Sequence, residues 1–328
     1  MSFVNMEAVS IRKPLKEARF PFNRAQSLED AVSRVATGYF TDASIGGRFE
    51  TRGVLVIGES RQGKSTEIDE MLKKFNDGTT IMPDGRPAKI VSCLLSGKVT
   101  WMSLGTEILD VLGYPLRGRR NQDYIWSKVR KYAEEQGVIG IHFDECQHVF
   151  TEGDSKTNHK FLDSFKSLLK DHRWPLMLIF SGVPSLALQI RKEEQLFTLL
   201  EPVRFEGINL SSKTDEEELV HLVFSYCDKA QLEFDDFEMA DFLARLVFAG
   251  CQRWGLVIEL LIEALSLALL KGDKVCKIAH FAQAFSQISG SPLGYSPFTM
   301  PNYQDNFDQE KLFVMYEKTR TKKTPKKK

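Results

Sequence analysis

One stretch of the sequence constrains the fold most strongly: residues 53–66, which read GVLVIGESRQGKST. Its first part, residues 54–57, is a short apolar run of the kind that forms a buried strand. The run continues into GESRQGKS, which matches the phosphate-binding pattern G-x-x-x-x-G-K-S, and a helix-compatible segment follows over residues 67–75. A strand before this pattern and a helix after it separate a working P-loop from a chance match. The stretch therefore predicts a nucleoside triphosphate site.

Each residue type in this loop has a chemical reason to be there. Gly58 and Gly63 let the backbone curl, so that its N–H groups face phosphate oxygens at a helix N-terminus. Lys64 supplies a positive charge for the β and γ phosphates, and the hydroxyl of Ser65 is offered to Mg²⁺. The predicted nucleotide-binding residues fill the whole loop: Gly58, Glu59, Ser60, Arg61, Gln62, Gly63, Lys64, Ser65 and Thr66.

A pair of carboxylates ends a second apolar segment, residues 138–143. Asp144 and Glu145 close this predicted strand downstream of the P-loop, which is the Walker B pattern. We expect Asp144 to hold Mg²⁺ through its water shell and Glu145 to polarise the attacking water. The neighbouring His142, Cys146 and His148 fit no zinc-binding spacing, so a metal site of that kind is rejected.

Strand-like and helix-like segments alternate over the first two thirds of the chain. The predicted strands are 54–57, 89–95, 138–143 and 175–180, and the last one ends at Ser181, a position beside the γ phosphate in many P-loop ATPases. This alternation predicts an α/β core with a parallel sheet covered by helices on both faces. From about residue 210 only helical patterns remain. The expected organisation is an extended arm over 1–26, a nucleotide-binding core over 27–210, an all-α lid over 211–289, and a strap with a basic tail over 290–328.

Composition limits the environment in which the chain works. No apolar run approaches the roughly 20 residues of a membrane span, and the N-terminus lacks the apolar core of a signal peptide. The five cysteines are odd in number and form no C-x-x-C pair, so reduced thiols in a cytoplasmic protein are expected. The zero net charge hides a tail, residues 318–328, with seven basic groups and no acid. Such a tail contacts nucleic acid or an acidic partner, or is a solvated extension.

Four stretches resemble the AAA+ ATPases and, among them, the TniB/TnsC group of transposition ATPases. They read VLVIGESRQGKST, IGIHFDECQHVF, KFLDSFKSLLKDHRWPLMLIFSGVPSLAL and EEQLFTLLEPVRFEGINL, and the resemblance extends over roughly residues 30–290. It implies ATP and Mg²⁺ as cofactors and ATP-dependent assembly on DNA, with recruitment of a transposase. It also assigns Lys64, Ser65 and Thr66 to Walker A, and Ser181 to sensor 1.

This sequence departs from the family pattern at two positions. The family places an arginine and a phenylalanine before the pair that stands here as Glu201-Pro202, and this chain has Leu199-Leu200 instead. The nearest substitutes for the trans-acting arginine, which completes a neighbour's site, are Arg191 and Arg204. The lid helix that usually carries a sensor 2 arginine offers Arg253.

Three classes of function fit the sequence: a DNA-binding regulator of transposition, a P-loop signalling switch that works without DNA, and a kinase. An adjacent Asp-Glu pair suits water activation rather than phosphoryl transfer, which disfavours the kinase. A basic surface decides between the other two, and its predicted residues are Lys98, Arg117, Arg119 and Arg120, although solvated loops are often charged as well. The expected partners are double-stranded DNA, a transposase, a target-selection protein and further copies of the chain in a ring or filament.

Overall fold

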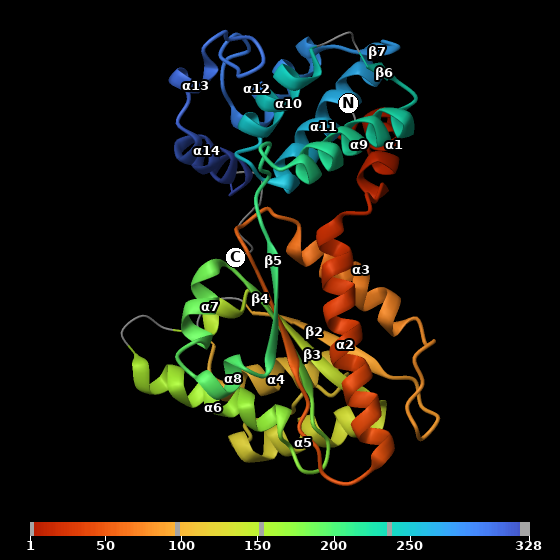
Figure 1. Cartoon of the computed structure of the whole chain (residues 1–328), viewed down its shortest axis with the longest axis vertical. Coiled ribbons are helices and arrows are strands. Elements are labelled where there is room, and N and C mark those ends of the chain that lie inside the picture. The colour runs from red at the N-terminus through yellow and green to blue at the C-terminus, as the bar shows by residue number, and fades with distance from the viewer. Residues whose placement is uncertain (1–2, 96–98, 151–153, 235–237, 322–328) are drawn as a thin grey trace. The chain divides into compact units, whose positions relative to one another are not determined.

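The strand that precedes the P-loop lies inside a five-stranded parallel sheet (Figure 1). The strands follow the spatial order β2-β3-β4-β1-β5. Their bounds are β1 Gly53–Gly58, β2 Lys89–Leu94, β3 Val138–Asp144, β4 Met177–Gly182 and β5 Leu200–Phe205. Because parallel strands point the same way, the carboxyl ends of the neighbours β3, β4 and β1 meet at one edge of the sheet.

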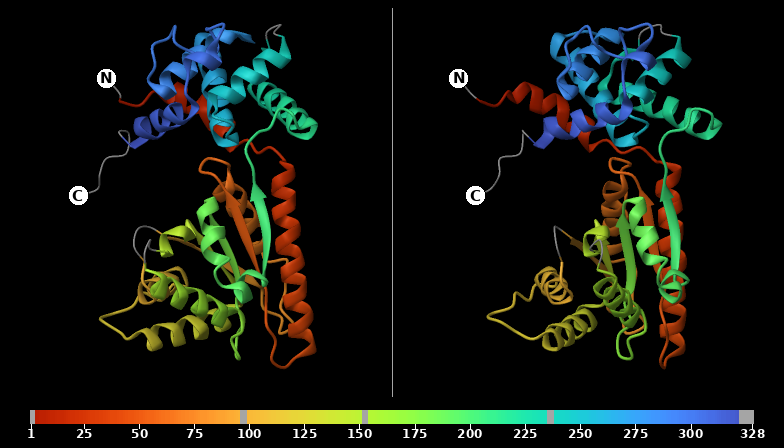
Figure 2. Two further views of the ribbon diagram at one scale, coloured as in Figure 1. Left: turned by 60° about the vertical axis from the view of Figure 1, so that its left-hand side comes forward. Right: turned by 90° about the vertical axis from the view of Figure 1, so that its left-hand side faces the viewer.

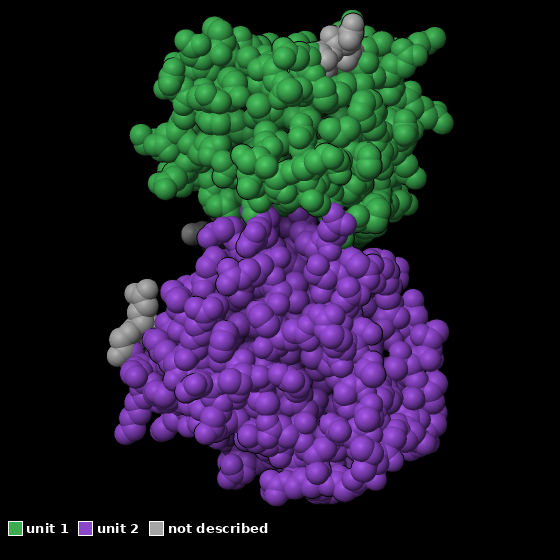
Figure 3. All heavy atoms as spheres, in the orientation of Figure 1, with its two compact units in different colours: residues 1–22, 207–328 green, residues 23–206 purple. Residues whose placement is uncertain are grey.

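The chain divides into two compact units, which Figure 3 colours separately. Unit 2 comprises residues 23–206 and contains the sheet, whereas unit 1 comprises residues 1–22 and 207–328. The computed structural model describes residues 3–95, 99–150, 154–234 and 238–321.

Helices cover both faces of the sheet in unit 2. On one face, α2 and α3 pack against Val54, Val56 and Ile179, and α2 also runs alongside β5 (Figure 2). On the other face, α4 to α8 pack against a core that includes Leu55 and Phe180. The bounds are α2 Asn23–Ile45, α3 Lys64–Asn76, α4 Trp101–Val111, α5 Gln122–Gln136, η1 Cys146–Val149, α6 Ser155–Leu169, α7 Pro184–Ile190 and α8 Glu194–Phe197. Since both faces are covered, the central strands β1, β3 and β4 are mainly apolar on both faces instead of alternating, and His142 and Ser181 are buried polar exceptions.

The predicted parallel α/β core is confirmed, and all four predicted strands are present. The fifth strand, β5, is not predicted, because Glu201, Pro202 and Arg204 interrupt its apolar pattern. An edge strand tolerates such residues, since only one of its sides pairs with a neighbour. Leu200, at the start of β5, is buried and supplies part of the core.

Unit 1 is mainly helical. Its elements from residue 207 onward are α9 Lys213–Ala230, β6 Glu233–Phe234, α10 Met239–Ala249, α11 Trp254–Lys271, β7 Val275–Cys276 and α12 Ile278–Ser289, followed by α13 Tyr303–Asn306 and α14 Gln309–Thr321. The short strands β6 and β7 pair in parallel, a feature that the helical pattern does not predict. The core contains an edge-to-face pair of Phe242 and Phe281, with ring centroids 4.9 Å apart. No described helix is long and apolar enough to cross a membrane.

Two terminal predictions are wrong. Residues 1–26, predicted as an extended arm, contain α1 Met6–Glu17 and the start of α2. Residues 290–328, predicted as an extended strap with a basic tail, contain the short helix α13 and the helix α14 in their described part, while 322–328 lie outside the described residues. Helices of this kind gain stability from tertiary packing that local pattern does not reveal. Arg12 pairs with Glu263 at 2.5 Å, and the buried Tyr316 hydroxyl donates to the carbonyl of Ala249 at 2.6 Å.

Close strand packing predicts that Gly53→Ala destabilises the protein. A Cβ there would lie 2.2 Å from the carbonyl oxygen of Leu178 and 2.7 Å from Cδ2 of Leu200. Overpacking of this kind costs about 1–3 kcal/mol. Gly38→Ala in α2 is the matched control, because nothing lies within 4 Å of a Cβ at that position. There alanine is expected to add about 0.5–1 kcal/mol of helix stability. Urea unfolding measures both, and equal stabilities of the two variants would contradict the β4-β1-β5 packing.

Candidate nucleotide-binding site

The loop between β1 and α3 has a backbone suited to an anion. Gly63 is the N-cap of α3 with a φ of 87°, in the left-handed region that glycine adopts without strain. Gly63 has no side chain to cap the helix, and the N-terminus of α3 directs its first backbone N–H groups and the positive end of its dipole toward the loop, which suits an anion. Gly58 ends β1, and a Cβ there would lie 2.4 Å from the carbonyl oxygen of Phe205. The two glycines therefore serve different purposes: Gly63 makes the turn, and Gly58 allows close packing against β5.

Lys64 is buried although it carries a charge, with a relative exposure of 6%. Its ammonium donates to the carbonyl oxygens of Gly58 and Glu59 at 2.7 and 2.9 Å. These bonds fold the side chain back across the loop, beside the N-terminus of α3. The ammonium of Lys64 therefore adds positive charge beside the N-terminus of α3, where the helix dipole also favours an anion.

Three elements meet at the carboxylate of Asp144, at the end of β3. The Ser65 hydroxyl of α3 donates to Oδ2 at 2.9 Å, and the Ser181 hydroxyl of β4 donates to Oδ1 at 2.6 Å. Hydroxyl and carboxylate oxygens are the hard ligands that Mg²⁺ prefers. The oxygens of Ser65 and Asp144 therefore fit that ion, as the sequence predicts.

Glu145 follows in a left-handed backbone conformation, with a φ of 54°. A non-glycine residue in this region is uncommon, and such residues concentrate at functional sites. The Glu145 N–H donates to Asp144 Oδ1 at 3.0 Å, and its carboxylate accepts from the side-chain amide of Gln147. The other end of that amide, Gln147 Oε1, accepts from the Val183 N–H at 3.3 Å. Gln147 thus joins Glu145 to the segment after β4, a contact without any periodic sequence signal.

His142 lies in β3, two residues before Asp144, and is almost completely buried, with 1% exposure. Its Nε2 is 2.8 Å from Ser181 Oγ, and its Nδ1 is 2.9 Å from Ser92 Oγ in β2. Burial lowers the pKa of His142 to about 4, so the ring is neutral at physiological pH. Both ring nitrogens lie within hydrogen-bonding distance of serine hydroxyls, so this geometry does not favour His142 as a zinc ligand.

The arginines implied by the family resemblance lie in different elements. Arg191 is exposed at the C-cap of α7, 5.2 Å from the ring centroid of Phe197. Arg204 is exposed on the edge strand β5. Arg253, in unit 1, is the N-cap residue of α11, and its guanidinium lies 3.9 Å from the ring centroid of Phe313.

The basic loop predicted to contact DNA connects α4 and α5 in unit 2. Its three predicted arginines are exposed: Arg117, Arg119 and Arg120. The Arg120 guanidinium is 5.5 Å from the ring centroid of Tyr124, and Lys128 Nζ is 5.4 Å from the same ring. Lys128, one helical turn after Tyr124 on α5, therefore extends the basic surface. Lys98 lies outside the described residues.

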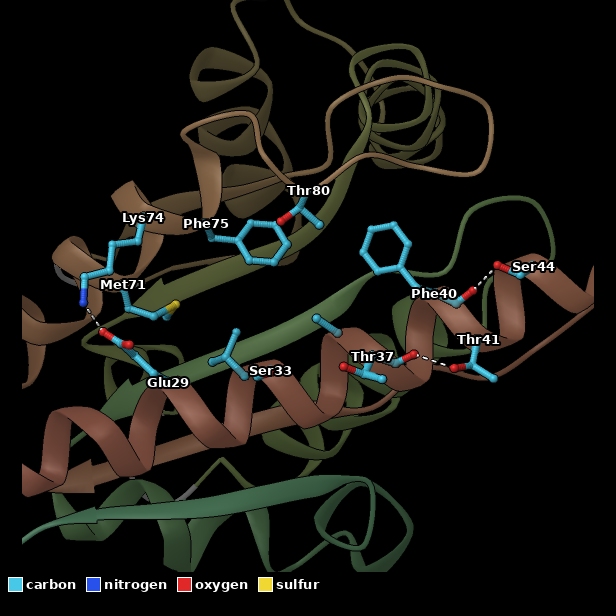
Figure 4. Close-up of a pocket in the computed structure, with 12 residues that line it drawn as sticks. Glu29, Ser33, Thr37, Phe40, Thr41, Ser44, Met71, Lys74, Phe75 and Thr80 are labelled. Carbon is cyan, nitrogen blue, oxygen red and sulfur yellow. Dashed lines mark hydrogen bonds and ion pairs between the residues drawn. The ribbon is translucent and has the colours of Figure 1, made fainter.

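A groove of about 600 Å³ lies between α2 and α3 (Figure 4). Phe40, Met71 and Phe75 give it apolar walls, and Lys74 pairs with Glu29 at its border. The remaining lining residues are small, or carry hydroxyls, of which those of Thr41 and Ser44 bond to carbonyls of α2 itself. These lining residues do not include a nucleophile paired with a base, so they give no indication of a second reactive centre.

Comparison with solved structures identifies the fold. The Cdc6 protein of Pyrobaculum aerophilum is 12% identical with a TM-score of 0.59, covering 94% of this chain and 89% of its own. Aeropyrum pernix ORC2, solved with ADPNP and ADP, is 14% identical with a TM-score of 0.58, covering 84% of this chain and 71% of its own. Drosophila ORC bound to DNA is 11% identical with a TM-score of 0.57, covering 89% and 69%. At these identities the likeness concerns the fold alone.

Comparison of the sequence gives the family. A search of curated proteins finds no match. The sequence model of the family described as bacterial TniB protein matches residues 43–212, which is more than half of the chain and includes the P-loop, the Asp144-Glu145 pair and Ser181. The predicted resemblance is confirmed: the chain belongs to the TniB family and is an AAA+ ATPase.

Proposed function

We propose that this ATPase assembles on double-stranded DNA and that ATP controls its recruitment or activation of a transposase. The observation that carries the nucleotide chemistry is the convergence on Asp144 of Ser65 from the P-loop helix and Ser181 from β4. Membership of the TniB family supports the role in transposition.

The P-loop residues provide the binding half of the site. The Lys64 ammonium, released from the carbonyls of Gly58 and Glu59, is positioned to bond the β and γ phosphates. The first N–H groups of α3 receive phosphate oxygens, aided by the positive end of the helix dipole. Ser65 and Asp144 would hold Mg²⁺, which supplies neutralisation of the phosphate charge when bound.

The residues at the ends of β3 and β4 provide the hydrolytic half. Glu145 is the group that orients and polarises the attacking water, since its carboxylate directly follows Asp144. Ser181 is the γ-phosphate sensor, and its hydroxyl already donates to an anionic oxygen at 2.6 Å. Gln147 fixes the direction of the Glu145 carboxylate relative to the segment after β4.

DNA binding and assembly complete the proposal. The exposed loop of Arg117, Arg119 and Arg120 suits phosphate contacts, which position a protein on a duplex without reading its sequence. The Drosophila ORC structure of the same fold is bound to DNA, which supports this association. Arg191 and Arg204 are both exposed, so either could reach the site of a neighbouring subunit.

The nucleotide roles predict different losses for two substitutions. Lys64→Ala should abolish ATP binding, because it removes the ammonium that the loop places for the phosphates. Glu145→Gln should retain binding and stop hydrolysis, because an amide does not polarise water as a carboxylate does. Titration with a fluorescent ATP analogue and phosphate release measure the two properties. Lys73→Ala, an exposed lysine on the same helix, is the control and should change neither. Normal hydrolysis by Glu145→Gln would refute the role of that carboxylate.

The DNA surface predicts a salt-dependent defect. Replacing Arg119 and Arg120 by alanine should weaken duplex binding by a similar factor on unrelated sequences, because phosphates and not bases are contacted. The slope of log K against log salt should become shallower by about 0.9 for each DNA phosphate that the variant no longer neutralises. Fluorescence anisotropy at three salt concentrations, with ATP and with ADP, gives both quantities.

A charge-matched variant controls for the removal of two positive groups. Lys213→Ala combined with Lys311→Ala removes two side chains that are 87% and 83% exposed in unit 1. This variant should bind DNA almost as the unmodified protein does. Equal defects in the two double variants would show that net charge, and not the loop, governs binding. Absence of any ATP-dependent DNA binding by the intact protein would instead favour a switch that acts only on protein partners.

A further inference from the structure

A row of polar side chains crosses three strands on the sheet face that carries α2 and α3. Ser92 of β2 lies directly opposite His142 of β3, and His142 lies opposite Ile179 of β4, two residues before Ser181. Side chains two residues apart in a strand share a face. The measured contacts follow this register, with 2.9 Å from Ser92 Oγ to His142 Nδ1 and 2.8 Å from His142 Nε2 to Ser181 Oγ. The row then reaches Asp144 Oδ1, 2.6 Å from Ser181 Oγ.

The contact between Ser181 and Asp144 fixes the direction of every proton in the row. A hydroxyl has one proton, and an ionised carboxylate can only accept. At 2.6 Å from Asp144, the Ser181 hydroxyl must therefore donate its proton to that carboxylate. The carbonyl oxygen of Phe143, at 3.5 Å, is a much weaker acceptor. Ser181 Oγ is then an acceptor toward His142, so His142 Nε2 carries a proton. Since the neutral ring has one N–H, Nδ1 accepts from the Ser92 hydroxyl.

We propose that His142 is a positioning residue for hydrolysis, which makes Ser181 a donor toward the nucleotide. By occupying a lone pair of Ser181 Oγ, the imidazole N–H leaves the hydroxyl proton only the outward direction. That proton points to Asp144 in this structure and is available to a γ-phosphate oxygen when ATP is bound. The proposal rests on the proposed role of Ser181 as sensor and adds the residue that orients it.

The surroundings of His142 support a role beyond packing. The residues on either side of His142 in β3, Ile141 and Phe143, are buried and apolar. Packing alone would therefore favour an apolar residue at position 142. Burial of an imidazole is unfavourable unless both nitrogens find partners. Both do, and one partner is the sensor hydroxyl itself. Residues that orient a group bound to the reacting centre affect activity without touching the substrate.

Two amide substitutions separate orientation from general polarity. His142→Gln can carry an N–H to about the position of Nε2, whereas the shorter His142→Asn reaches only toward Ser92. We expect His142→Asn to lower kcat by about 10- to 100-fold, with little change in the dissociation constant of ATP. His142→Gln should recover most of the missing kcat. In the Ser181→Ala background both substitutions should have no further effect, because coupled residues are not additive.

The possible outcomes distinguish the role of His142 from the proposed function. Normal hydrolysis by Ser181→Ala would refute the sensor role on which the inference rests. Impaired hydrolysis by Ser181→Ala, together with equal kcat for His142→Asn and His142→Gln, would overturn the orienting role of His142 alone. A fall of kcat that parallels a fall in melting temperature in both variants would likewise overturn it, because that result is expected of a residue that only supports packing.

A second test keeps His142 in place, so it does not depend on whether a His142 variant folds. Nitrogen-15 NMR of histidine-labelled protein separates the two neutral tautomers, and replacing the other five histidines one at a time assigns the signal. The inference requires His142 with a proton on Nε2 and none on Nδ1. It further requires that this tautomer persists when a non-hydrolysable ATP analogue and Mg²⁺ are added. A proton on Nδ1 in either state would overturn it.

Discussion

The structure of the site depends on two hydrogen bonds that the Asp144 carboxylate accepts from serine hydroxyls. Ser65 approaches it from the first turn of α3, and Ser181 approaches it from the end of β4. A carboxylate at the carboxyl edge of a covered parallel sheet is costly to bury unless donors surround it. The two serines meet this need, and in doing so they hold the P-loop helix against the edge where β3 and β4 end. The binding half and the hydrolytic half of the site are joined at this one group.

The fold makes this junction possible through close contacts between β1 and its neighbours. Gly53 and Gly58 allow β4 and β5 to approach β1 without a side chain between them. The ammonium of Lys64 is then held over the loop by the carbonyl oxygens of Gly58 and Glu59. On the other side of Asp144, Gln147 connects Glu145 to the Val183 N–H. Contacts within the protein therefore place groups from β1, β3, β4 and α3 relative to one another.

The sequence predicts much of this site because its signals are local. The P-loop spacing, the apolar strand that ends in Asp144-Glu145 and the strand that ends at Ser181 each lie within one short segment. The partners that come from other strands are harder to predict, since the register of β2, β3 and β4 decides that Ser92, His142 and Ser181 form a row. The same limit applies to β5, where Pro202 is acceptable only because the strand lies at the sheet edge. Helices α1 and α14 depend on packing within unit 1, so their local patterns are weak.

Lys64, Ser65 and Asp144 are proposed to form one site for ATP and Mg²⁺. A crystal structure with Mg²⁺ and a non-hydrolysable ATP analogue tests this assignment most directly. We expect Lys64 Nζ to leave the carbonyls of Gly58 and Glu59 for phosphate oxygens, and Mg²⁺ to replace the direct hydrogen bond between Ser65 and Asp144. A nucleotide bound elsewhere, with these hydrogen bonds of Lys64 and Ser65 unchanged, would contradict the assignment.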